Sequence, residues 1–453
     1  MRWLPWLMAA ATLGCASGAT DRLVDETFEL ASAREAGSAR GPTPPAPDLT
    51  GPVTREQVLA LVVARDPGLA ARALRVRAAL HTARAEGALP APEINGQVWN
   101  LPLARPYALG EANMYMVEVR QMFPAAGVRD ARARAQTEEA RGMVAELTER
   151  EQEVLQRAGQ AYADYVHGTL DHRVHAGHLA LLAEMLDAVR ARLTAGGTTL
   201  GDVARVEAER ARTRREIARI NGEIAQARAT LNALLLRAPD APLGPPADLA
   251  PQTVRLPTSE LLGRAARARS VFAQARTRIG AAHARSDAAR AEAIWPEVTV
   301  ALSYWQDPQQ RPGVGTTVAM SLPWVWSGAR ERLAAARARE AAEVVEARAT
   351  AVDVQVELTV ALERLWALEQ EFDVLRTDAR PAALHAIDAV RDGYVAGRGT
   401  LLDWLDAARG VLDVDMDEAG VTANLAHAVV DLEHAVGAPL PRVGLAVDQE
   451  GAR

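Results

Sequence analysis

Over most of its length, the chain carries apolar residues at the spacing of a helix. Between residues 127 and 194, for example, Val154, Ala158 and Ala161 follow one another at steps of four and three. Such alternating steps line one face of a helix and are typical of a coiled-coil seam. We therefore predict one helix over this range, roughly 100 Å long at a rise of about 1.5 Å per residue. A Gly-rich turn follows, and the spacing resumes on a helix that returns over residues 200–236.

Two short segments have a period of two instead. Within residues 93–123, Val117 and Val119 lie on the opposite face from Met116 if the backbone is extended. This alternation is typical of a β-strand, and the Pro- and Gly-rich stretch before it predicts a hairpin. Residues 296–323 have a similar pattern, so we predict a second strand hairpin there.

The order of these elements occurs twice along the chain. A helix, a strand hairpin, a long helix, a turn and a returning helix fill residues 54–237, and the same series fills residues 258–437. The two helical turns, at residues 194–202 and 395–403, also match in sequence. A repeat of this length predicts two interleaved copies of one unit, joined by a Pro-rich linker at residues 238–257, instead of two independent domains.

Each long helix needs more than one partner along its length. The helix that returns from the turn is only about half as long, so a second short helix must cover the remainder. The helices expected at residues 54–89 and 258–294 have the right length for that role. We therefore predict a mainly helical fold with a small β part, in which long antiparallel helical hairpins carry four strands per chain. Because four strands cannot close a barrel and open strand edges are not tolerated in lipid, several chains would have to share their strands in a membrane.

The amino terminus is predicted to direct export. Arg2 precedes a short apolar run followed by small residues, so residues 1–15 have the features of a signal peptide. Ordinary cleavage competes with lipidation of Cys15, which follows a relaxed lipobox. We expect an extended arm at residues 16–53 and a short tail at residues 438–453. After the signal, the sequence has no run of about eighteen apolar residues, as a transmembrane helix would need.

Composition removes several classes of function. The 58 acidic residues outnumber the 51 basic ones, all arginine, and the formal net charge of -7 is unlike that of a nucleic-acid-binding protein. The single cysteine excludes a disulfide framework within the chain. No Ser-centred elbow, H-E-x-x-H motif or phosphate-binding loop occurs, so we expect neither an enzyme nor a cofactor. His172, His175 and His178 share a helical face, but we interpret them as a polar stripe and expect no metal site.

Several motifs occur at matching places in the two repeats. Both strand hairpins begin at a Pro-Glu pair, the sequences FPAAGVRDARARA and LPWVWSGARERLAAA lead from strand to long helix, and the turns read RLTAGGTTLGDVARVEA and YVAGRGTLLDWLDAAR. In these features the chain resembles the TolC-type outer-membrane efflux proteins. It is most similar to the branch that serves metal or drug efflux pumps of the resistance-nodulation-division class, and the resemblance extends over residues 54–437.

The resemblance implies a homotrimer in the outer membrane. Three chains would share four strands each in a twelve-stranded transmembrane β-barrel surrounded by outer-membrane lipid. Their helices would form an α-barrel tunnel through the periplasm, whose tips meet a periplasmic adaptor protein and an inner-membrane resistance-nodulation-division pump. The chain would then be the passive exit duct of a tripartite efflux pump, gated at the helical tips.

The resemblance also assigns adaptor docking to the two helical turns. The same residues fit simple helix capping, because Gly ends helices and Thr begins them. The residues concerned are Gly196, Thr199 and Leu200 in the first turn and Gly397, Thr400 and Leu401 in the second.

The helix that leaves the second turn begins with two acidic residues. Asp403 and Asp406 share a helical face, and three copies around a narrow axis would form a ring of carboxylates that repels anions and binds cations. An acid near a helix N-terminus also simply favours the helix dipole. The resemblance implies the ring, together with a latch between Tyr394 and Asp202. The Arg of the family's latch is displaced by one residue, to Arg398, which turns a helical side chain by about 100°.

Two other functions stay open from the sequence. A type I secretion duct would share the channel architecture and export proteins. A lipid-anchored periplasmic adaptor or stalk would use the coiled coils without a channel. Two equal repeats with strands at the end opposite the turns argue against the adaptor.

Overall fold

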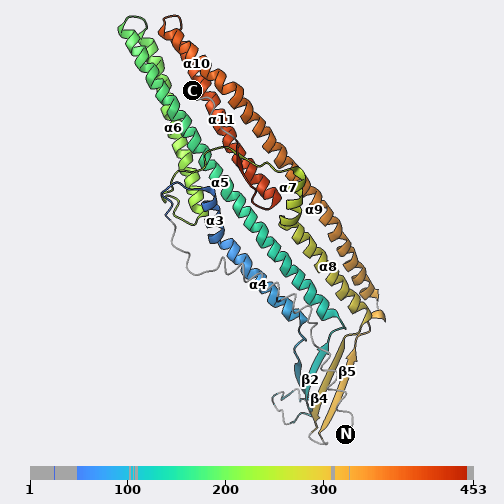
Figure 1. Ribbon diagram of the computed structural model, residues 1–453. Coiled ribbons are helices and arrows are strands. Elements are labelled where there is room, and N and C mark those ends of the chain that lie inside the picture. Colours follow the sequence, from blue (N-terminus) through green and yellow to red (C-terminus); the bar gives the residue numbers. More distant parts are fainter. Residues whose placement is uncertain are drawn as a thin grey trace. The chain divides into compact units, whose positions relative to one another are not determined.

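The computed structural model describes residues 48–445, apart from residues 102–103, 106, 108–110, 308–311 and 326, and it also describes residue 25. The predicted signal peptide with Cys15, nearly all of the predicted arm and the end of the predicted tail lie outside these residues. The described chain is mainly helical with a small β part, as the sequence predicts (Figure 1).

The chain forms two compact units, and each unit is made of several separate segments of the sequence. Leaving the undescribed termini aside, the first unit comprises Ala71–Leu147 and Val271–Ala351. The second unit comprises the residues up to Ala70, then Thr148–Ser270, and the residues from Val352 onward. Each unit therefore takes segments from both halves of the sequence, which is the arrangement that two interleaved repeats produce.

The strands of the first unit form one antiparallel sheet. β1 (Glu93–Trp99), β2 (Met114–Phe123), β4 (Val298–Gln306) and β5 (Gly313–Met320) lie in this order, so the two predicted hairpins meet between β2 and β4. The outer edges of β1 and β5 have no partner strand among the described residues. A short 3-10 helix, Pro323–Val325, follows β5.

The helices of the first repeat follow the predicted pattern closely. α3 (Arg55–Arg65) and α4 (Pro67–Gly87) are separated at Asp66, where Pro67 opens the new helix. α5 (Val128–Thr194) is uninterrupted, and α6 (Leu200–Leu234) returns from the first turn. The small-residue seams and helix ends of the sequence therefore suffice to predict these elements.

The helices of the second repeat contain two interruptions that the sequence interpretation did not include. The helix expected over residues 258–294 divides into α7 (Thr258–Ala268) and α8 (Ser270–Ile294) at Arg269, which has an extended backbone. The buried Arg269 guanidinium donates to the carboxylate of Glu357 at 2.9 Å and to the carbonyl of His434 at 2.7 Å. Arg269 binds both acceptors from the break between the two helices.

The second interruption lies in the long helix expected over residues 328–395. α9 (Ser327–Val374) passes into a π-helical turn, Leu375–Ala379, and then into α10 (Arg380–Val395). Pro381 lies in the first turn of α10 and has no N–H to donate to the preceding turn, which favours the wider winding before it. α11 (Leu401–Val436) returns from the second turn as predicted.

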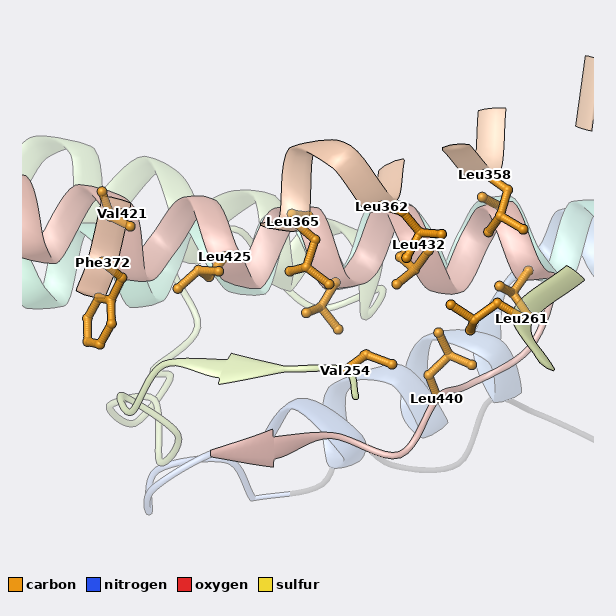
Figure 2. Close-up of a cluster of buried hydrophobic side chains, with 14 residues drawn as sticks. Val254, Leu261, Leu358, Leu362, Leu365, Phe372, Val421, Leu425, Leu432 and Leu440 are labelled. Carbon is orange, nitrogen blue, oxygen red and sulfur yellow. The ribbon is translucent and has the colours of Figure 1, made fainter. Parts of the chain in front are cut away.

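The core of the second unit lies between α7, α9 and α11 and the linker before α7. Figure 2 shows the cluster, in which side chains from α9 face those of α11 and of the linker. Its labelled members are Val254, Leu261, Leu358, Leu362, Leu365, Phe372, Val421, Leu425, Leu432 and Leu440. A second cluster joins α3, α5 and α6, and a third joins the two helical turns.

The ends of the described chain are fastened to the linker of the second unit. The Val53 backbone N–H donates to the Pro245 carbonyl at 2.9 Å, and the Tyr162 hydroxyl donates to the Val53 carbonyl at 2.9 Å. β3 (Gln252–Thr253) pairs with β6 (Val443–Gly444), a strand in the tail that the sequence did not predict.

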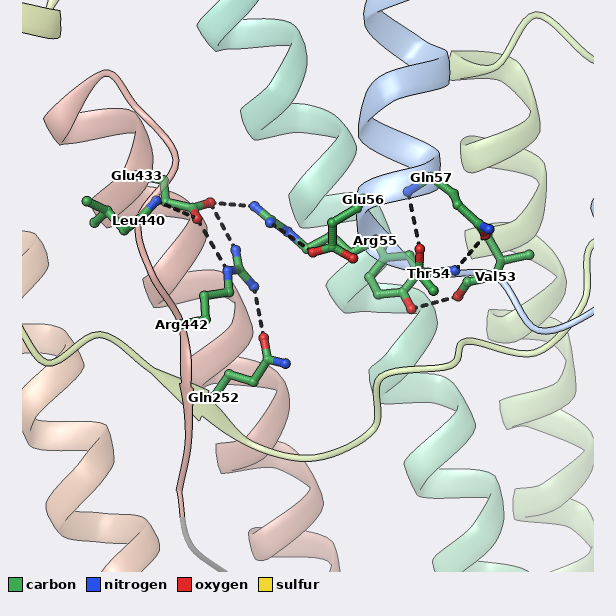
Figure 3. A network of polar contacts seen from close by, with 10 residues as sticks. Val53, Thr54, Arg55, Glu56, Gln57, Gln252, Glu433, Leu440 and Arg442 are labelled. Atoms are coloured by element: carbon green, nitrogen blue, oxygen red, sulfur yellow. Dashed lines mark hydrogen bonds and ion pairs between the residues drawn. The ribbon is translucent and has the colours of Figure 1, made fainter.

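A buried ionic group holds α3, α11 and the tail together in the second unit. Glu433 on α11 pairs with Arg55 on α3 and, at 2.9 Å, with Arg442 beside β6 (Figure 3). The three side chains are only 11 to 13% exposed. Because a buried charge left unpaired is costly, these three groups depend on one another.

Among the described residues, no helix has a stretch both long and apolar enough to cross a membrane.

Candidate functional site

One face of the four-stranded sheet is apolar and exposed. The register places Val117 opposite Tyr304 and Leu302 opposite Thr316, so the outward side chains of neighbouring strands form one continuous surface. Leu302 is 57% exposed and Val318 is 67% exposed, although both are apolar. The exposed members of this apolar sheet face are Ile94, Val98, Val117, Val119, Phe123, Leu302, Tyr304, Val314, Val318 and Met320.

The opposite face of the sheet mixes charged, small and larger apolar residues. Glu118 is buried there and accepts a hydrogen bond from Arg120 at 2.9 Å. The Trp305 ring lies against Gly313 and Gly315, where an added Cβ would come within 2.6 and 2.5 Å of the ring. The continuous apolar surface is therefore the other face, and an exposed apolar surface of this kind is suited to contact lipid or another apolar surface.

The two helical turns, both in the second unit, share one local design. Gly196 and Gly397 adopt φ values of 73° and 78°, which end α5 and α10 in a left-handed cap that favours glycine. Thr199 and Thr400 then begin α6 and α11, each with a reciprocal capping box. The capping role expected from the sequence is therefore present at both turns, which we call the first tip and the second tip.

The leucines assigned to docking differ between the tips. Leu200 on the first tip is 73% exposed and is free to contact a partner. Leu401, at the matching position of the second tip, is 4% exposed and packs with Trp404 and Leu405 in the third core cluster. Leu402 is the exposed leucine there, at 61%. Leu401 therefore stabilises the second tip, and Leu402 is the side chain that a partner can reach.

The two acids of the proposed ring have different surroundings. Asp403 accepts hydrogen bonds from the hydroxyl of Thr400 at 2.7 Å and from its backbone N–H at 3.2 Å. These bonds, the hydroxyl first, hold the pKa of the exposed Asp403 carboxyl below its usual range. Asp406 is also exposed and takes no part in the cap. The capping interpretation accounts for Asp403 but not for Asp406, which interacts instead with the charge of Arg409 further along α11.

The residues proposed as a latch are not bonded to one another within the described chain. The Tyr394 hydroxyl is buried without a hydrogen-bond partner. The Asp202 carboxylate instead accepts from the hydroxyl of Thr198 at 2.7 Å, and this bond, followed by those from Thr199, lowers the pKa of Asp202. Arg398 is exposed and serves the turn through its backbone N–H, which donates to the Gly393 carbonyl at 2.9 Å.

The sequence interpretation missed a residue that does contact Tyr394. Arg192, near the end of α5, places its guanidinium carbon 4.7 Å from the centre of the Tyr394 ring and donates to the Tyr394 carbonyl. A second donor of the same side chain binds the Gly197 carbonyl at 3.0 Å. An Arg in the last turn of a helix is common, so the sequence carried no signal that this one reaches the other tip.

Two of the histidines of α5 are buried in the second unit. His175 and His178 are 7% and 6% exposed, and burial lowers the pKa of both imidazoles. Neither side chain forms a cluster suited to a metal. Within the described part of the chain, no group of three or more His, Cys, Asp or Glu side chains is arranged to hold a metal ion.

The second repeat matches a known family. The profile of the family described as outer membrane efflux protein matches residues 261–438, which contain most of α7, strands β4 and β5 and the second tip. The chain carries an outer membrane efflux protein domain. The resemblance to outer-membrane efflux proteins is thereby confirmed over these residues, and members of this family are channels, not enzymes.

Solved structures of outer-membrane channels share the fold of this chain. The outer membrane protein VceC from Vibrio cholerae has a TM-score of 0.70 and 21% identity, with 85% of this chain and 97% of VceC covered. For CusC, described in connection with transmembrane channel formation, the TM-score is 0.72 at 18% identity, with 85% and 92% covered. The open state of the Neisseria gonorrhoeae MtrE outer membrane channel gives 0.69 at 20% identity, with 85% and 89% covered. No curated protein matches the chain.

Proposed function

We propose that this efflux protein is one subunit of a trimeric outer-membrane channel, the exit duct of a tripartite efflux pump. The observation that supports it best is the sheet, which has an exposed apolar face, an opposite face that carries the buried Glu118, and two edges without a partner strand among the described residues. Open edges are unfavourable in lipid and are removed when copies of the sheet join edge to edge. Three copies of four strands make a twelve-stranded barrel, with the apolar sheet face toward outer-membrane lipid.

The part of α9 in the second unit supports self-association as well. Val352, Val356 and Val360 follow one another at helical spacing and are 59%, 56% and 62% exposed. An apolar stripe of this kind on a helix calls for a partner surface. In the trimer, the neighbouring subunit covers this stripe, and the helices of three chains surround an aqueous tunnel in the periplasm.

The tips are the gate in this proposal. They meet a periplasmic adaptor, which couples the channel to an inner-membrane pump of the resistance-nodulation-division class. Three copies of Asp406, with Asp403 beside it, form an acidic constriction that binds cations and repels anions. Transport through the duct is passive in this proposal, because the pump supplies the energy. Docking of the adaptor separates the tips and opens the path.

The assembly is tested by the mass of the protein extracted in detergent from purified outer membranes, corrected for bound detergent. A mass near three processed chains in that fraction is the expected result. Absence from that fraction, or a monomer there, would overturn the channel and favour a lipid-anchored stalk. Bilayer recordings of the purified trimer alone do not distinguish an efflux duct from a type I secretion duct. Recordings with each candidate pump do, and we expect the efflux pump to be the partner.

The lipid-facing role of the sheet has its own pair of variants. Val318 lies on the apolar sheet face, whereas its neighbour Thr317 lies on the opposite face. A charged residue on a lipid-facing strand costs about 2–4 kcal/mol near the bilayer midplane, and one facing the lumen costs far less. Val318→Arg should therefore reduce the trimer recovered from outer membranes, and Thr317→Arg should not. Equal recovery of the two variants would contradict the assigned orientation.

A further inference from the structure

We propose that Arg192 ties the two helical tips of one chain together and thereby holds the gate shut. The inference rests on the proposed function, because it names the residue that controls the opening of that same gate. Both tips belong to the second unit, and Figure 1 shows them at the same end of that unit.

The Arg192 side chain reaches from the first tip to the end of α10. One of its donors binds the Gly197 carbonyl at 3.0 Å, which fixes the side chain over its own turn. Another binds the Tyr394 carbonyl, one of the last carbonyls of α10, where a cation is favourable to the helix dipole. The guanidinium also lies 4.7 Å from the centre of the Tyr394 ring. One side chain thus makes a cation–π contact and two hydrogen bonds at the junction.

Tyr394 depends on this contact because it is enclosed. The side chain is 3% exposed, and its ring centre is 5.2 Å from that of Trp404 on α11. The Tyr394 hydroxyl and the Trp404 indole nitrogen are both buried and have no hydrogen-bond partner in the described part of the chain. Separation of the tips would break the Arg192 contacts and expose the two rings. The closed arrangement is therefore stabilised by Arg192 and by burial of aromatic surface together.

Among the described residues, no arginine of the second tip makes a reciprocal contact. Arg398 is exposed, and Arg391 pairs with Asp388 at 3.1 Å within α10. The position that matches Arg192 in the second repeat is Gly393, which has no side chain to reach back. The contact between the tips is therefore made by a side chain of the first tip. Arg409 of α11 forms an ion pair with Glu209 of α6 at 2.7 Å, which also joins the two helical hairpins but lies further from the tips.

The chain offers a matched control two residues away. Arg190 is on the same helix and pairs with Glu207 of α6 at 2.8 Å, so it stays within the first helical hairpin. Loss of Arg190 removes a charge and an exposed ion pair without touching the second tip. Such exposed pairs contribute little to stability.

The experiment compares the wild type with Arg192→Ala, Arg192→Lys and Arg190→Ala as purified trimers in planar bilayers. We expect Arg192→Ala to raise the open probability by about tenfold, since it removes a cation–π contact and charged hydrogen bonds. Arg192→Lys should lie between, because an ammonium keeps the charge but loses the planar fork. Arg190→Ala should behave as the wild type. Adding Tyr394→Leu to Arg192→Ala should raise the open probability by less than the two single substitutions together would, because both substitutions remove the same contact.

A distance measurement separates this inference from the proposed function. Spin labels at Ala195 and Ala396, which are exposed at matching positions of the two tips, report the distance between the tips by double electron–electron resonance. This measurement needs no ion flow. We expect a longer and broader distance distribution in Arg192→Ala than in Arg190→Ala. Identical distributions would overturn the tie even if the protein conducts. A changed distribution in a trimer that never conducts would keep the tie and contradict the channel.

Discussion

Asp406 occupies, at the start of α11, the position that Arg205 occupies at the start of α6. Each lies three residues after the capping aspartate of its tip, Asp403 or Asp202. Arg205 forms an ion pair with Asp202 at 3.2 Å, so the first tip is locally neutralised. In the second tip the same helical turn carries two carboxylates instead. The two tips share their backbone design and differ in charge, because the second tip has an aspartate, Asp406, where the first has Arg205; Asp406 in turn interacts with Arg409 further along α11.

This asymmetry separates charge from capping in one set of variants. Asp406→Asn should weaken the block of the channel by divalent cations, raising the half-blocking concentration by roughly fivefold, since a charge about 4 Å away contributes about 1 kcal/mol even in bulk water. Its effect on stability should be small, because Asp406 takes no part in the cap. Asp388→Asn, an exposed acid on α10, is the matched control in the same bilayer recordings. An unchanged half-blocking concentration in Asp406→Asn would contradict the ring.

The capping boxes make a prediction about stability. Thr400→Ala removes the hydroxyl that accepts the Asp403 backbone N–H at 3.2 Å, and Thr199→Ala does the same at the first tip. Each should lower the free energy of unfolding by about 1 kcal/mol, the usual effect of losing an N-cap. The control is Thr194→Ala, whose exposed hydroxyl donates to the Ala191 carbonyl inside α5. Urea titration monitored by circular dichroism measures the differences, and equal midpoints for Thr400→Ala and Thr194→Ala would refute the assignment.

The sequence predicts those parts of the fold that depend on local pattern. α5 is one uninterrupted helix because small and apolar side chains recur along its whole seam, and the strands follow from strict alternation. The break at Arg269 depends instead on Glu357 and His434, which lie far away in the sequence. The pairing of β3 with β6 joins two short segments that have little strand pattern of their own. Such features arise from tertiary contacts, which a single sequence does not display.

The candidate site divides in the same way. The caps at Thr199 and Thr400 could be predicted, since a capping box is written within four consecutive residues. The role of Arg192 could not be predicted, because it depends on how closely the two tips approach. The burial of Leu401 was also hidden, because Leu401 and Leu402 are identical in type and only the orientation of α11 decides which one faces inward.

The core of the second unit predicts a large effect from a single truncation. Leu365 on α9 is fully buried in the cluster of Figure 2. Leu365→Ala should lower the free energy of unfolding by about 2–5 kcal/mol through lost contacts and the cavity left behind. Val360→Ala, five residues earlier at 62% exposure, should change the stability of a subunit little but weaken its association with other copies. Urea midpoints and detergent-corrected mass measure the two effects. A larger loss of subunit stability for Val360→Ala would contradict the assignment of the faces.

The buried histidines of α5 predict acid sensitivity. His175 faces Glu216 and Arg219 of α6 and Asp171 of its own helix, but burial has the largest effect and lowers its pKa. Burial likewise lowers the pKa of His178, which lies near Glu209 of α6 and Arg409 of α11. An unfolded chain, with an ordinary histidine pKa of about 6.5, then binds protons that the folded chain does not. The contribution of the two groups to stability is complete above that pH and declines as the pH falls from 6.5 toward the lowered folded values.

Hydrogen exchange of α5 and α6 at about pH 7.5 and 5.5 tests this expectation, after correction for the intrinsic exchange rates. Protection of these helices should fall in acid for the wild type, and the fall should be smaller when His175→Gln and His178→Gln are combined. The control is His385→Gln on the exposed face of α10, which should keep the wild-type dependence. Burial raises the pKa of Asp171, but its effect lies around its ordinary value of 3.8 and above it, with the opposite sign. Acid loss of protection that persists unchanged in the double variant would show that other groups are responsible.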